Sequence, residues 1–541
     1  MADRKRYVQV GLGSRSNMFR SAILDVYKET CDLVGVCDSN AGRLRLAAEE
    51  CRLQGGDPKP YAAEDFDRMV RECRAQAVVV TTKDCHHDEY VCRGMELGCD
   101  VITEKPMTTD EQKCQRIIDT QRRTGRQCRV TFNYRYSPPR TQLKDLLISG
   151  VIGNVISVDF HWLLDTSHGA DYFRRWHRNK VNSGGLMVHK ATHHFDLVNW
   201  FLSAIPVQVF ASGDRQFYTP KTAWRYGLSK RAERCLDCPE KSKCNFFLDL
   251  AGNEHLKKRY LDNEQYDGYF RDRCVFSELI DIEDTMNLVV NYDSGTILTY
   301  SLNAFMPWEG YTISFNGTKG RLEHVCRETV YVSGDGSVPG ELISEGTTTT
   351  VYPHFKDPYR VEVWQGKGGH GGGDRLLLQD VFDPGSREDK YNHAADHRGG
   401  AYSILTGVAA NRSMASGQPV RIDQLCTGIG YPDYPPMPRP DEPLPMEKPT
   451  AVRSRPGAIK AKPEKAKKPG KKRVVRKKVA KKKSVKKAKK STRKKPAKKS
   501  ARKAGKPVKK KASKKKVARK KPARKKPVKK ARKARGKKRN K

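Results

Sequence analysis

Short runs of apolar residues alternate with helix-length stretches over the first 135 residues. The pattern predicts buried strands at 8–11, 33–38, 77–82, 101–104 and 129–133, and helices at 15–28, 41–51, 88–97 and 110–123. Strands that are apolar throughout, rather than at every second position, are typical of a parallel sheet covered on both faces. Because the strands alternate with helices, we expect a doubly wound α/β domain over residues 1–135.

The turn after the first strand has the spacing of a dinucleotide-binding loop. It reads GLGSRS at 11–16 and opens the first predicted helix. Glycine at the first two marked positions lets the backbone turn sharply and approach a pyrophosphate, whose charge is met by the helix N-terminus. Serine stands where the fingerprint has a third glycine or alanine, and a turn without a ligand is the alternative. The turn is therefore predicted to bind a dinucleotide through Gly11, Gly13, Ser14, Arg15 and Ser16.

An acidic residue at the end of the second strand bears on the choice of cofactor. Asp38 lies 25 residues after Gly13. A carboxylate at this place hydrogen-bonds the ribose hydroxyls and repels a 2′-phosphate, which favours NAD over NADP. Arg43 lies close by in the sequence and keeps NADP open as the alternative.

Polar residues follow two further strands of this domain. Thr81, Thr82 and His86 come just after one strand, and Glu104 and Lys105 end another. Ligands of open α/β sheets bind at the carboxyl ends of the strands, so we expect these residues to contact the cofactor. A lysine beside the positively charged nicotinamide has a lowered pKa and can exchange a proton with a substrate hydroxyl. Lys105 is therefore a candidate catalytic residue, and a solvated Glu-Lys ion pair is the alternative.

The segment SGGLMVHKATHHFDLVNWFL at 183–202 supplies a second set of candidate residues. His189, His193 and Asp196 fall at i, i+4 and i+7, which is one stripe of a predicted helix. Three polar groups on a largely apolar helix are costly unless they are paired or used. We therefore expect this stripe to face an active site, whereas a single histidine there would more often be a hydrogen-bonded core residue.

Together these motifs resemble those of the Gfo/Idh/MocA family, which includes glucose–fructose oxidoreductase and inositol dehydrogenase. The resemblance spans residues 1 to about 430. It implies a Rossmann domain over 1–135 and an α+β domain over 136–430 with an open, mainly antiparallel sheet that often makes oligomer contacts. A homo-oligomer is therefore expected. The resemblance also implies oxidation or reduction of a carbohydrate, that is, a sugar, sugar acid or cyclitol, with NAD or NADP.

Residue by residue, the resemblance implies three roles. Lys105 matches the family's EKP lysine, His193 its conserved histidine, and Asp196 the last aspartate of the motif. The chain departs at His189, where many dehydrogenases of the family have an aspartate that orients the histidine. An imidazole supplies no fixed negative charge, so we expect His189 to carry a proton itself, or Lys190 to assist. The departure indicates a subfamily with altered substrate handling.

Three further stretches are expected to complete the substrate pocket. Tyr134 and Arg135 follow the last strand of the first domain. Trp176 and His177 suit the stacking and hydroxyl bonding of a sugar. The stretch GGHGGGD at 368–374 is too rich in glycine for regular structure and offers His370, with a flexible linker as the alternative.

Four cysteines lie in a predicted insertion at about 212–280. Cys235 and Cys238 have C-x-x-C spacing, Cys244 follows them, and Cys274 lies 30 residues later. Four thiolates suit a structural zinc ion, although the second pair lacks this spacing, and a disulfide or unlinked thiols are the alternatives. After the insertion, the alternating pattern over 286–305 predicts an antiparallel hairpin.

The positive charge of the chain is concentrated at its C-terminal end. The formal net charge is +45, and residues 451–541 hold 49 of the 106 lysines and arginines but one of the 61 acidic residues. This segment has no aromatic residue and resembles the basic tails of linker histones. We expect a disordered tail after a proline-rich linker at 431–450. Such a tail binds nucleic acid or another polyanion in a salt-sensitive way.

Composition also bears on localisation. No run of 18 apolar residues occurs, so no membrane span is expected, and the first residues lack the apolar stretch of an export signal. Fifteen scattered cysteines favour a reducing cytoplasm, and the basic tail adds association with the nucleoid as an expectation.

Three functions are consistent with these observations. The first is an NAD(P)-dependent dehydrogenase that acts on a CH–OH group of a carbohydrate. The second is an NAD-dependent glycosidase that oxidises a sugar transiently and eliminates the aglycone. The third is a sensor or nucleoid-associated protein that keeps the NAD-binding fold and works through its tail.

Overall fold

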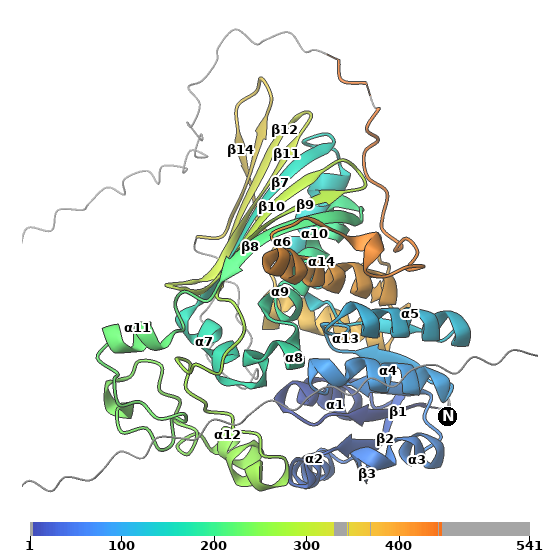
Figure 1. The fold of residues 1–541 in the computed structure, drawn as a ribbon. Coiled ribbons are helices and arrows are strands. Elements are labelled where there is room, and N and C mark those ends of the chain that lie inside the picture. The colour runs from blue at the N-terminus through green and yellow to red at the C-terminus, as the bar shows by residue number, and fades with distance from the viewer. Residues whose placement is uncertain (1–3, 329–342, 344–345, 368, 442, 446–541) are drawn as a thin grey trace, which may run out of the picture. The chain divides into compact units, whose positions relative to one another are not determined.

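A seven-stranded sheet forms the N-terminal part of the molecule (Figure 1). The computed structural model describes residues 4–328, 343, 346–367, 369–441 and 443–445. In spatial order the strands are β15 (Ala395–Asp396), β6 (Cys128–Val130), β5 (Asp100–Thr103), β4 (Ala77–Val80), β1 (Lys5–Val10), β2 (Cys31–Asp38) and β3 (Lys59–Ala62). All neighbouring strands are parallel except β15, which pairs antiparallel to β6 at the edge. The predicted Rossmann domain is confirmed.

Helices cover both faces of this sheet. They are α1 (Asn17–Ser21), α2 (Ala41–Leu53), α3 (Phe66–Glu72), α4 (His87–Glu96), α5 (Glu111–Thr124) and α13 (Gly373–Phe382). Helix α13 comes from the C-terminal half of the chain, and the ring of Phe382 lies edge-on to that of Tyr7, with centroids 5.2 Å apart. Leu377 and Val381 join the same buried cluster. The C-terminal residues therefore return to complete the Rossmann domain.

The second sheet has nine strands within the described residues and is mainly antiparallel, as the resemblance implied. Its order is β14 (Tyr359–Val361), β13 (Thr348–Pro353), β12 (Gly320–Glu328), β11 (Glu309–Gly317), β7 (Val155–Asp165), β10 (Ile297–Met306), β9 (Thr285–Tyr292), β8 (Pro206–Asp214) and β16 (Val420–Arg421). Only β7 and β10 pair in parallel. The predicted hairpin at 286–305 is confirmed as β9 and β10.

Three helices lie between the second sheet and the Rossmann domain (Figure 1). They are α6 (Pro138–Ile148), α10 (Thr192–Leu202) and α14 (His397–Ser416). Shorter helices α7 (Thr166–Arg174), α8 (Lys180–Ser183) and α9 (Leu186–His189) approach the carboxyl ends of the Rossmann strands. The aromatic side chains of Phe160 and Trp162 on β7 pack in one continuous core with α10. This packing fixes α10, which carries His193, on the second sheet.

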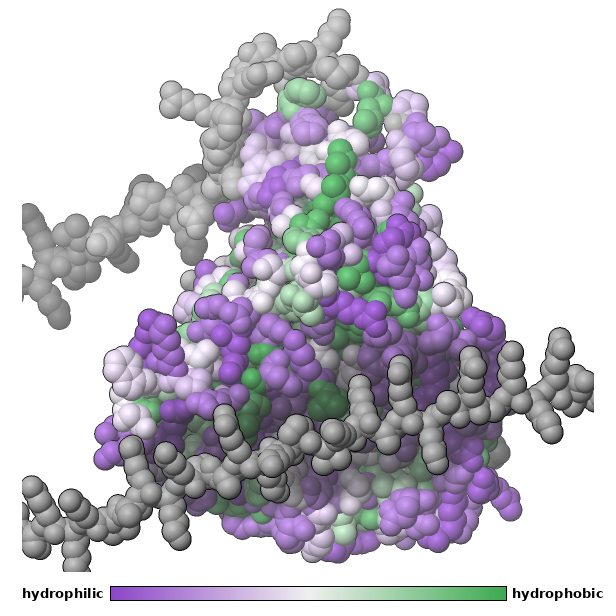
Figure 2. Space-filling view, viewed as in Figure 1, coloured by the Kyte–Doolittle hydropathy of each residue, from purple (hydrophilic) through white to green (hydrophobic). Residues whose placement is uncertain are grey.

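The chain between β8 and β9 forms an insertion of few regular elements. It contains α11 (Pro220–Arg225) and α12 (Glu254–Arg259), and α12 lies beside α2 of the Rossmann domain (Figure 1). In Figure 2 hydrophilic side chains predominate over the lower part of the molecule, whereas hydrophobic ones form a broken strip over the second sheet.

Several sequence-based expectations differ from the structure. Strand β3 and helix α3 were not predicted, because KPYA at β3 is short and half-exposed and lacks an apolar run. The single helix expected to carry His189, His193 and Asp196 is two helices, since α9 ends at His189 and α10 starts at Thr192. The basic tail at 451–541 lies outside the described residues. Among the described residues no helix is long and apolar enough to cross a membrane.

Candidate active site

A cavity of about 520 Å³ opens at the carboxyl ends of β1, β2, β4 and β5. Its walls come from the Rossmann domain, from α7–α10 and from the insertion. Of the predicted site residues, those that line it are Gly11, Gly13, Ser14, Arg15, Asp38, Thr81, Thr82, His86, Glu104, Lys105, Tyr134, Trp176, His177, His189, His193 and His370. The fold therefore brings most of the predicted residues to one place.

The glycine turn requires glycine at its first position. Gly11 has φ +85°, and a Cβ there would lie 2.5 Å from the Thr82 backbone nitrogen. Thr81 Oγ1 donates to the Gly11 carbonyl at 2.6 Å. Ser16 is buried beneath the turn and donates to the Gly13 carbonyl at 2.5 Å, so it shapes the turn and does not line the cavity.

Asp38 lies at the end of β2 and is held by the backbone. One carboxylate oxygen accepts from the Leu12 amide at 2.6 Å, and the other accepts from the Asn40 amide at 2.7 Å. Arg43 approaches the second oxygen at 3.2 Å. These contacts fix the carboxylate on the cavity wall, where an adenosine ribose would lie in a Rossmann domain.

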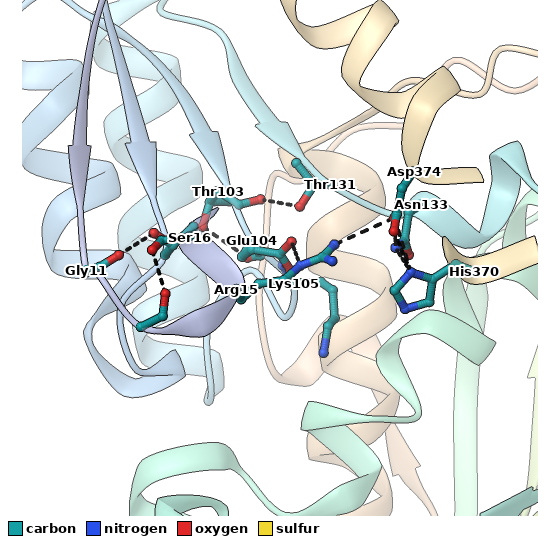
Figure 3. Close-up of polar contacts among 12 residues, drawn as sticks. Gly11, Arg15, Ser16, Thr103, Glu104, Lys105, Thr131, Asn133, His370 and Asp374 are labelled. Carbon is teal, nitrogen blue, oxygen red and sulfur yellow. Dashed lines mark hydrogen bonds and ion pairs between the residues drawn. The ribbon is translucent and has the colours of Figure 1, made fainter. Parts of the chain in front are cut away.

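A polar network joins the turn to the C-terminal segment (Figure 3). Arg15 Nε donates to Glu104 Oε1 at 2.7 Å, and its Nη2 lies 3.9 Å from Asp374 Oδ1. Asn133 Nδ2 donates to the same Asp374 oxygen at 2.6 Å, and His370 Nδ1 lies 3.0 Å from the other. The glycine-rich stretch at 369–372 thus has a defined path, and His370 adopts a left-handed conformation with φ +52°. Residues 369–372 therefore form a structured part of the site, and His370 lines the cavity, in place of the flexible linker that was the alternative.

Lys105 lies at the head of a chain of proton-carrying groups. Its Nζ is 3.5 Å from His189 Nε2, and His189 Nδ1 is 2.5 Å from Asp84 Oδ2. Burial lowers the pKa of Lys105, with Arg15 and Arg175 adding to the effect against Asp84 and Glu104. Burial and the Lys105 charge hold the pKa of His189 well below its usual range. Asp84 supplies the carboxylate that the motif at His189 lacks, but it comes from the other domain.

The imidazole of His193 lies flat against a tyrosine. Its ring stacks on Tyr134 with centroids 4.1 Å apart and planes 11° from parallel. Tyr134 also accepts a hydrogen bond from Lys190 Nζ at 2.9 Å. Burial lowers the pKa of Lys190 to about 8, against the carboxylates of Glu309 and Glu328. Lys190, which the family motif does not single out, is therefore a second amine on the cavity wall.

A third cluster on the cavity wall consists of His168, Tyr172 and Glu309. His168 Nδ1 lies 2.9 Å from Glu309 Oε1, and His168 Nε2 lies 2.9 Å from the Tyr172 hydroxyl. Burial raises the pKa of Glu309 to about 8, although the Lys190 charge opposes the rise. No local sequence motif indicated Glu309. It is the first residue of β11, and the pairing of the strands in the second sheet brings it to the site.

Two buried imidazole nitrogens on the cavity wall have no hydrogen-bond partner within the described residues. They are Nδ1 of His177 and Nδ1 of His193. His177 stacks on Trp176 with centroids 3.6 Å apart and packs edge-on against His189 at 4.2 Å. Buried polar groups are normally satisfied, so these nitrogens indicate hydrogen-bonding positions for a ligand.

Some predicted residues do not meet in the cavity. Arg135 and Asp196 form a buried two-bond ion pair at 2.8 and 2.5 Å and do not line it. The pair holds the 3₁₀ helix at Asn133–Tyr136 against α10, so both residues act in packing. His86 lies at the rim with its side chain half-exposed.

The four cysteines of the insertion line a small separate cavity of about 20 Å³ and are free thiols. In the described part of the chain no group of three or more His, Cys, Asp and Glu residues is arranged to hold a metal ion. The expected zinc site therefore finds no support there, and the disulfide alternative is not formed.

Comparison with known proteins agrees with this geometry. Residues 5–132 match the family model described as "Oxidoreductase family, NAD-binding Rossmann fold", and residues 144–422 match "Oxidoreductase family, C-terminal alpha/beta domain". The oxidoreductase YteT of Bacillus subtilis is 36% identical over 431 residues, which cover 78% of this chain and 98% of YteT.

Two more distant relatives are informative. The inositol 2-dehydrogenase/D-chiro-inositol 3-dehydrogenase of Lactiplantibacillus plantarum is 27% identical over 173 residues, 32% of this chain and 45% of that protein. The WlbA dehydrogenase from Bordetella pertussis, solved in complex with NADH and UDP-GlcNAcA, has a TM-score of 0.51 at 17% identity and covers 77% of this chain and 99% of its own. The latter likeness concerns the fold.

Proposed function

The chain belongs to the Gfo/Idh/MocA family of NAD(P)-dependent oxidoreductases, and from that premise we propose that it is an NAD-dependent dehydrogenase of a CH–OH group in a sugar, sugar acid or cyclitol. The observation that carries the proposal is the hydrogen-bonded chain of Lys105, His189 and Asp84, which lies at the carboxyl ends of β4 and β5. It supplies a buried amine with a route for a proton, which alcohol oxidation requires.

The residues present fit a nicotinamide dinucleotide. Gly11 lets the turn pack against the Thr81 and Thr82 backbone, where a Cβ would collide, and Gly11, Leu12, Gly13 and Ser14 line the cavity. Asp38 is oriented by the Leu12 and Asn40 amides and suits the ribose hydroxyls of NAD. The bound dinucleotide supplies the hydride acceptor for the reaction.

The protein groups handle the proton of the substrate hydroxyl. Because burial lowers its pKa, the Lys105 amine has a neutral fraction that can accept this proton. His189 accepts a hydrogen bond from Lys105 through Nε2 while its Nδ1–H donates to Asp84, which fixes the tautomer that relays a proton. Asp84 thus orients the imidazole in the way an aspartate next to a catalytic histidine does.

Further hydrogen-bonding groups that line the cavity support a polyhydroxy substrate. Among the described residues, Nδ1 of His177 and Nδ1 of His193 have no hydrogen-bond partner, and Trp176 offers a flat face. Tyr134 and His370 line the same cavity. The inositol dehydrogenase among the relatives acts on a cyclitol, as its name states, which supports the same substrate class.

A substrate panel tests the proposal. The purified full-length chain is mixed with NAD⁺ or NADP⁺ and with sugars, sugar acids, cyclitols and aryl glycosides, and both nicotinamide absorbance and products are followed. Net reduction of NAD⁺ by a free polyol or sugar is expected. Release of aglycone without net reduction would instead identify a glycosidase, and no turnover together with no NAD⁺ binding would refute the proposed activity.

We further propose that the tail at 451–541 tethers the enzyme to a polyanion. Its 49 basic residues support this role, because each neutralised phosphate releases counterions. Deletion of the tail should abolish retention on double-stranded DNA at low salt and leave turnover unchanged. Equal retention of the full-length and the tail-deleted protein on DNA would contradict the proposed tethering role of the tail.

The outer face of the second sheet supports a homo-oligomer. Phe210, Val289 and Ile297 on β8, β9 and β10 are 48%, 39% and 47% exposed. We propose that a second copy covers this face. Light scattering of the parent and of a Phe210→Glu variant tests it, since the charge should dissociate the assembly.

A further inference from the structure

One buried tyrosine of the insertion, Tyr260, lies at the part of the cavity formed by the glycine turn. Tyr260, directly after α12, is 6% exposed and lines the cavity next to the glycine turn. Its hydroxyl lies 2.9 Å from Ser14 Oγ and accepts from the Ser14 amide at 3.3 Å. This amide belongs to the turn whose N–H groups face a pyrophosphate in Rossmann proteins.

The surroundings of Tyr260 are cationic. Burial raises the pKa of this phenol, but Arg175, the Ser14 hydrogen bond, Arg271 and Arg259 together bring it below its usual value. Arg259 donates to the Leu12 carbonyl at 3.3 Å and pairs with Glu50. Arg271 pairs with Asp171, whereas Arg175 lines the cavity with Tyr260. A hydroxyl and a guanidinium on one cavity wall are complementary to a diphosphate.

The same segment reaches the ribose end of the cavity. Asp267 Oδ2 lies 2.7 Å from Arg43 Nη2, and the same nitrogen lies 3.2 Å from Asp38 Oδ1. All three side chains are largely buried, and Asp267 lines the cavity. Arg43 is therefore held between two carboxylates, and the net negative charge of this trio opposes a 2′-phosphate.

The segment is docked on α2 by close backbone approach. Asn40 Nδ2 donates to the Asn263 carbonyl at 2.9 Å. A Cβ at Gly42 would lie 1.7 Å from Asn263 Oδ1, so this first turn of α2 accepts the insertion only because residue 42 has no side chain. The contacts thus fix residues 260–267 over the cofactor half of the site.

We propose that this segment of the insertion is a wall of the dinucleotide site, in which Tyr260 binds the pyrophosphate and Asp267 selects NAD over NADP by holding Arg43. The inference rests on the use of a nicotinamide dinucleotide proposed above. It extends the site beyond the Rossmann domain, to residues that no part of the glycine fingerprint includes.

Equilibrium binding without substrate tests the Tyr260 role. The dissociation constants of NAD⁺ and NADH are measured by calorimetry for the full-length parent, for Tyr260→Phe and for Tyr266→Phe. Tyr266 belongs to the same segment and is the matched control. Its hydroxyl contacts Arg45 of α2, and Tyr266 does not line the cavity. Tyr260→Phe should weaken binding by roughly ten- to a hundredfold, the range of one hydrogen bond to a charged group. Thermal unfolding confirms that each variant is folded, and unchanged affinity in a folded Tyr260→Phe variant would overturn the role.

Cofactor preference tests the Asp267 role. In Asp267→Asn, the ratio of NADP⁺ to NAD⁺ affinity should rise about tenfold, which corresponds to loss of one screened charge interaction. The matched control is Asp262→Asn, since Asp262 pairs with Lys257 at the surface. Adding Arg43→Ala to Asp267→Asn should remove the gain, and an unchanged ratio in Asp267→Asn would refute selection by this residue. A parent that binds neither cofactor would refute the proposed function instead, so the two failures are distinct.

Discussion

The imidazole of His189 lies between the Lys105 amine and the Asp84 carboxylate. Its Nε2 is 3.5 Å from Lys105 Nζ, and its Nδ1 is 2.5 Å from Asp84 Oδ2. Asp84 and Lys105 follow neighbouring parallel strands of one domain, β4 and β5, whereas His189 ends α9 of the other. The two domains therefore share one proton-carrying chain, and removal of any member should affect the reaction more than the fold.

Replacement of the Asp84 carboxyl group tests whether this chain operates. In Asp84→Asn the imidazole loses its fixed acceptor, so both tautomers of His189 become populated. We expect kcat to fall by about 10²-fold, while the dissociation constant of NAD⁺ stays unchanged. Steady-state kinetics and calorimetry give the two values. Asp119→Asn, at an exposed helix position paired with Arg122, is the control, and a parental kcat in Asp84→Asn would show that Asp84 has no part in catalysis.

Replacement of Lys105 should separate chemistry from binding. Lys105→Met keeps an unbranched chain of four atoms and removes the amine, and we expect kcat to fall by roughly 10²- to 10⁴-fold with NAD⁺ binding retained. Because burial lowers the pKa of Lys105, the parental rate of alcohol oxidation should rise with pH as the amine loses its proton. Lys113→Met, whose amine contacts the Cys85 carbonyl away from the cavity, should keep the parental profile. A rate that falls over the same pH range would exclude Lys105 as the base.

Glu309 offers a prediction on stability. Burial raises its pKa from 4.5 to about 8, so the folded state binds a proton that the unfolded state releases between these values. The stability that Glu309 contributes is therefore present below about pH 4.5 and lost as the pH rises through about 8. Glu309→Gln mimics the protonated form and should flatten this decline. Urea unfolding of parent and variant at several pH values measures it, and parallel curves would be the contrary result.

Much of the site could be predicted from local sequence. Gly11, Asp38 and Lys105 each follow a short apolar strand, and the doubly wound topology brings all parallel strand ends to one edge. His189 and His193 were marked by polar positions within an apolar segment. The helix break between them was not predicted, because Lys190 and Ala191 favour a continuous helix and both keep helical backbone angles in the structure.

The residues that were missed reach the site through tertiary structure. Glu309 starts a strand of the second sheet, and Tyr260 lies in an insertion with little regular structure. Asp84 lies two residues after Thr82, but His86 was predicted instead as a site residue after this strand, and His86 lies at the rim of the cavity. Arg135 and Asp196 show the converse, since a charged pair that looks reactive in the sequence is satisfied by itself in the core.

Gly11 can be tested with an unusually close control. Both Gly11 and Gly98 have positive φ, +85° and +86°, but a Cβ at Gly98 meets nothing within 4 Å whereas one at Gly11 collides with Thr82. Gly98→Ala should lose about 1–2 kcal/mol of stability from backbone strain, and Gly11→Ala should lose more because its Cβ also collides with the Thr82 backbone. Only Gly11→Ala should also lose NAD⁺ binding, by more than about tenfold. Similar affinities in the two variants would mean that the turn does not carry the dinucleotide.

The buried pair of Arg135 and Asp196 supplies a last test, which separates packing from substrate binding. Both side chains are almost completely buried and are joined by two hydrogen bonds. Gly399 of α14 lies against the guanidinium of Arg135. Asp196→Asn would leave the Arg135 charge without its partner, so we expect the free energy of unfolding to fall by about 3–5 kcal/mol. KM should remain at the parental value, because neither residue lines the cavity. Chemical denaturation and kinetics at a temperature where the variant is folded measure both quantities. A large rise in KM at parental stability would return Asp196 to the substrate site that its motif suggested, and the packing role would then have to be abandoned.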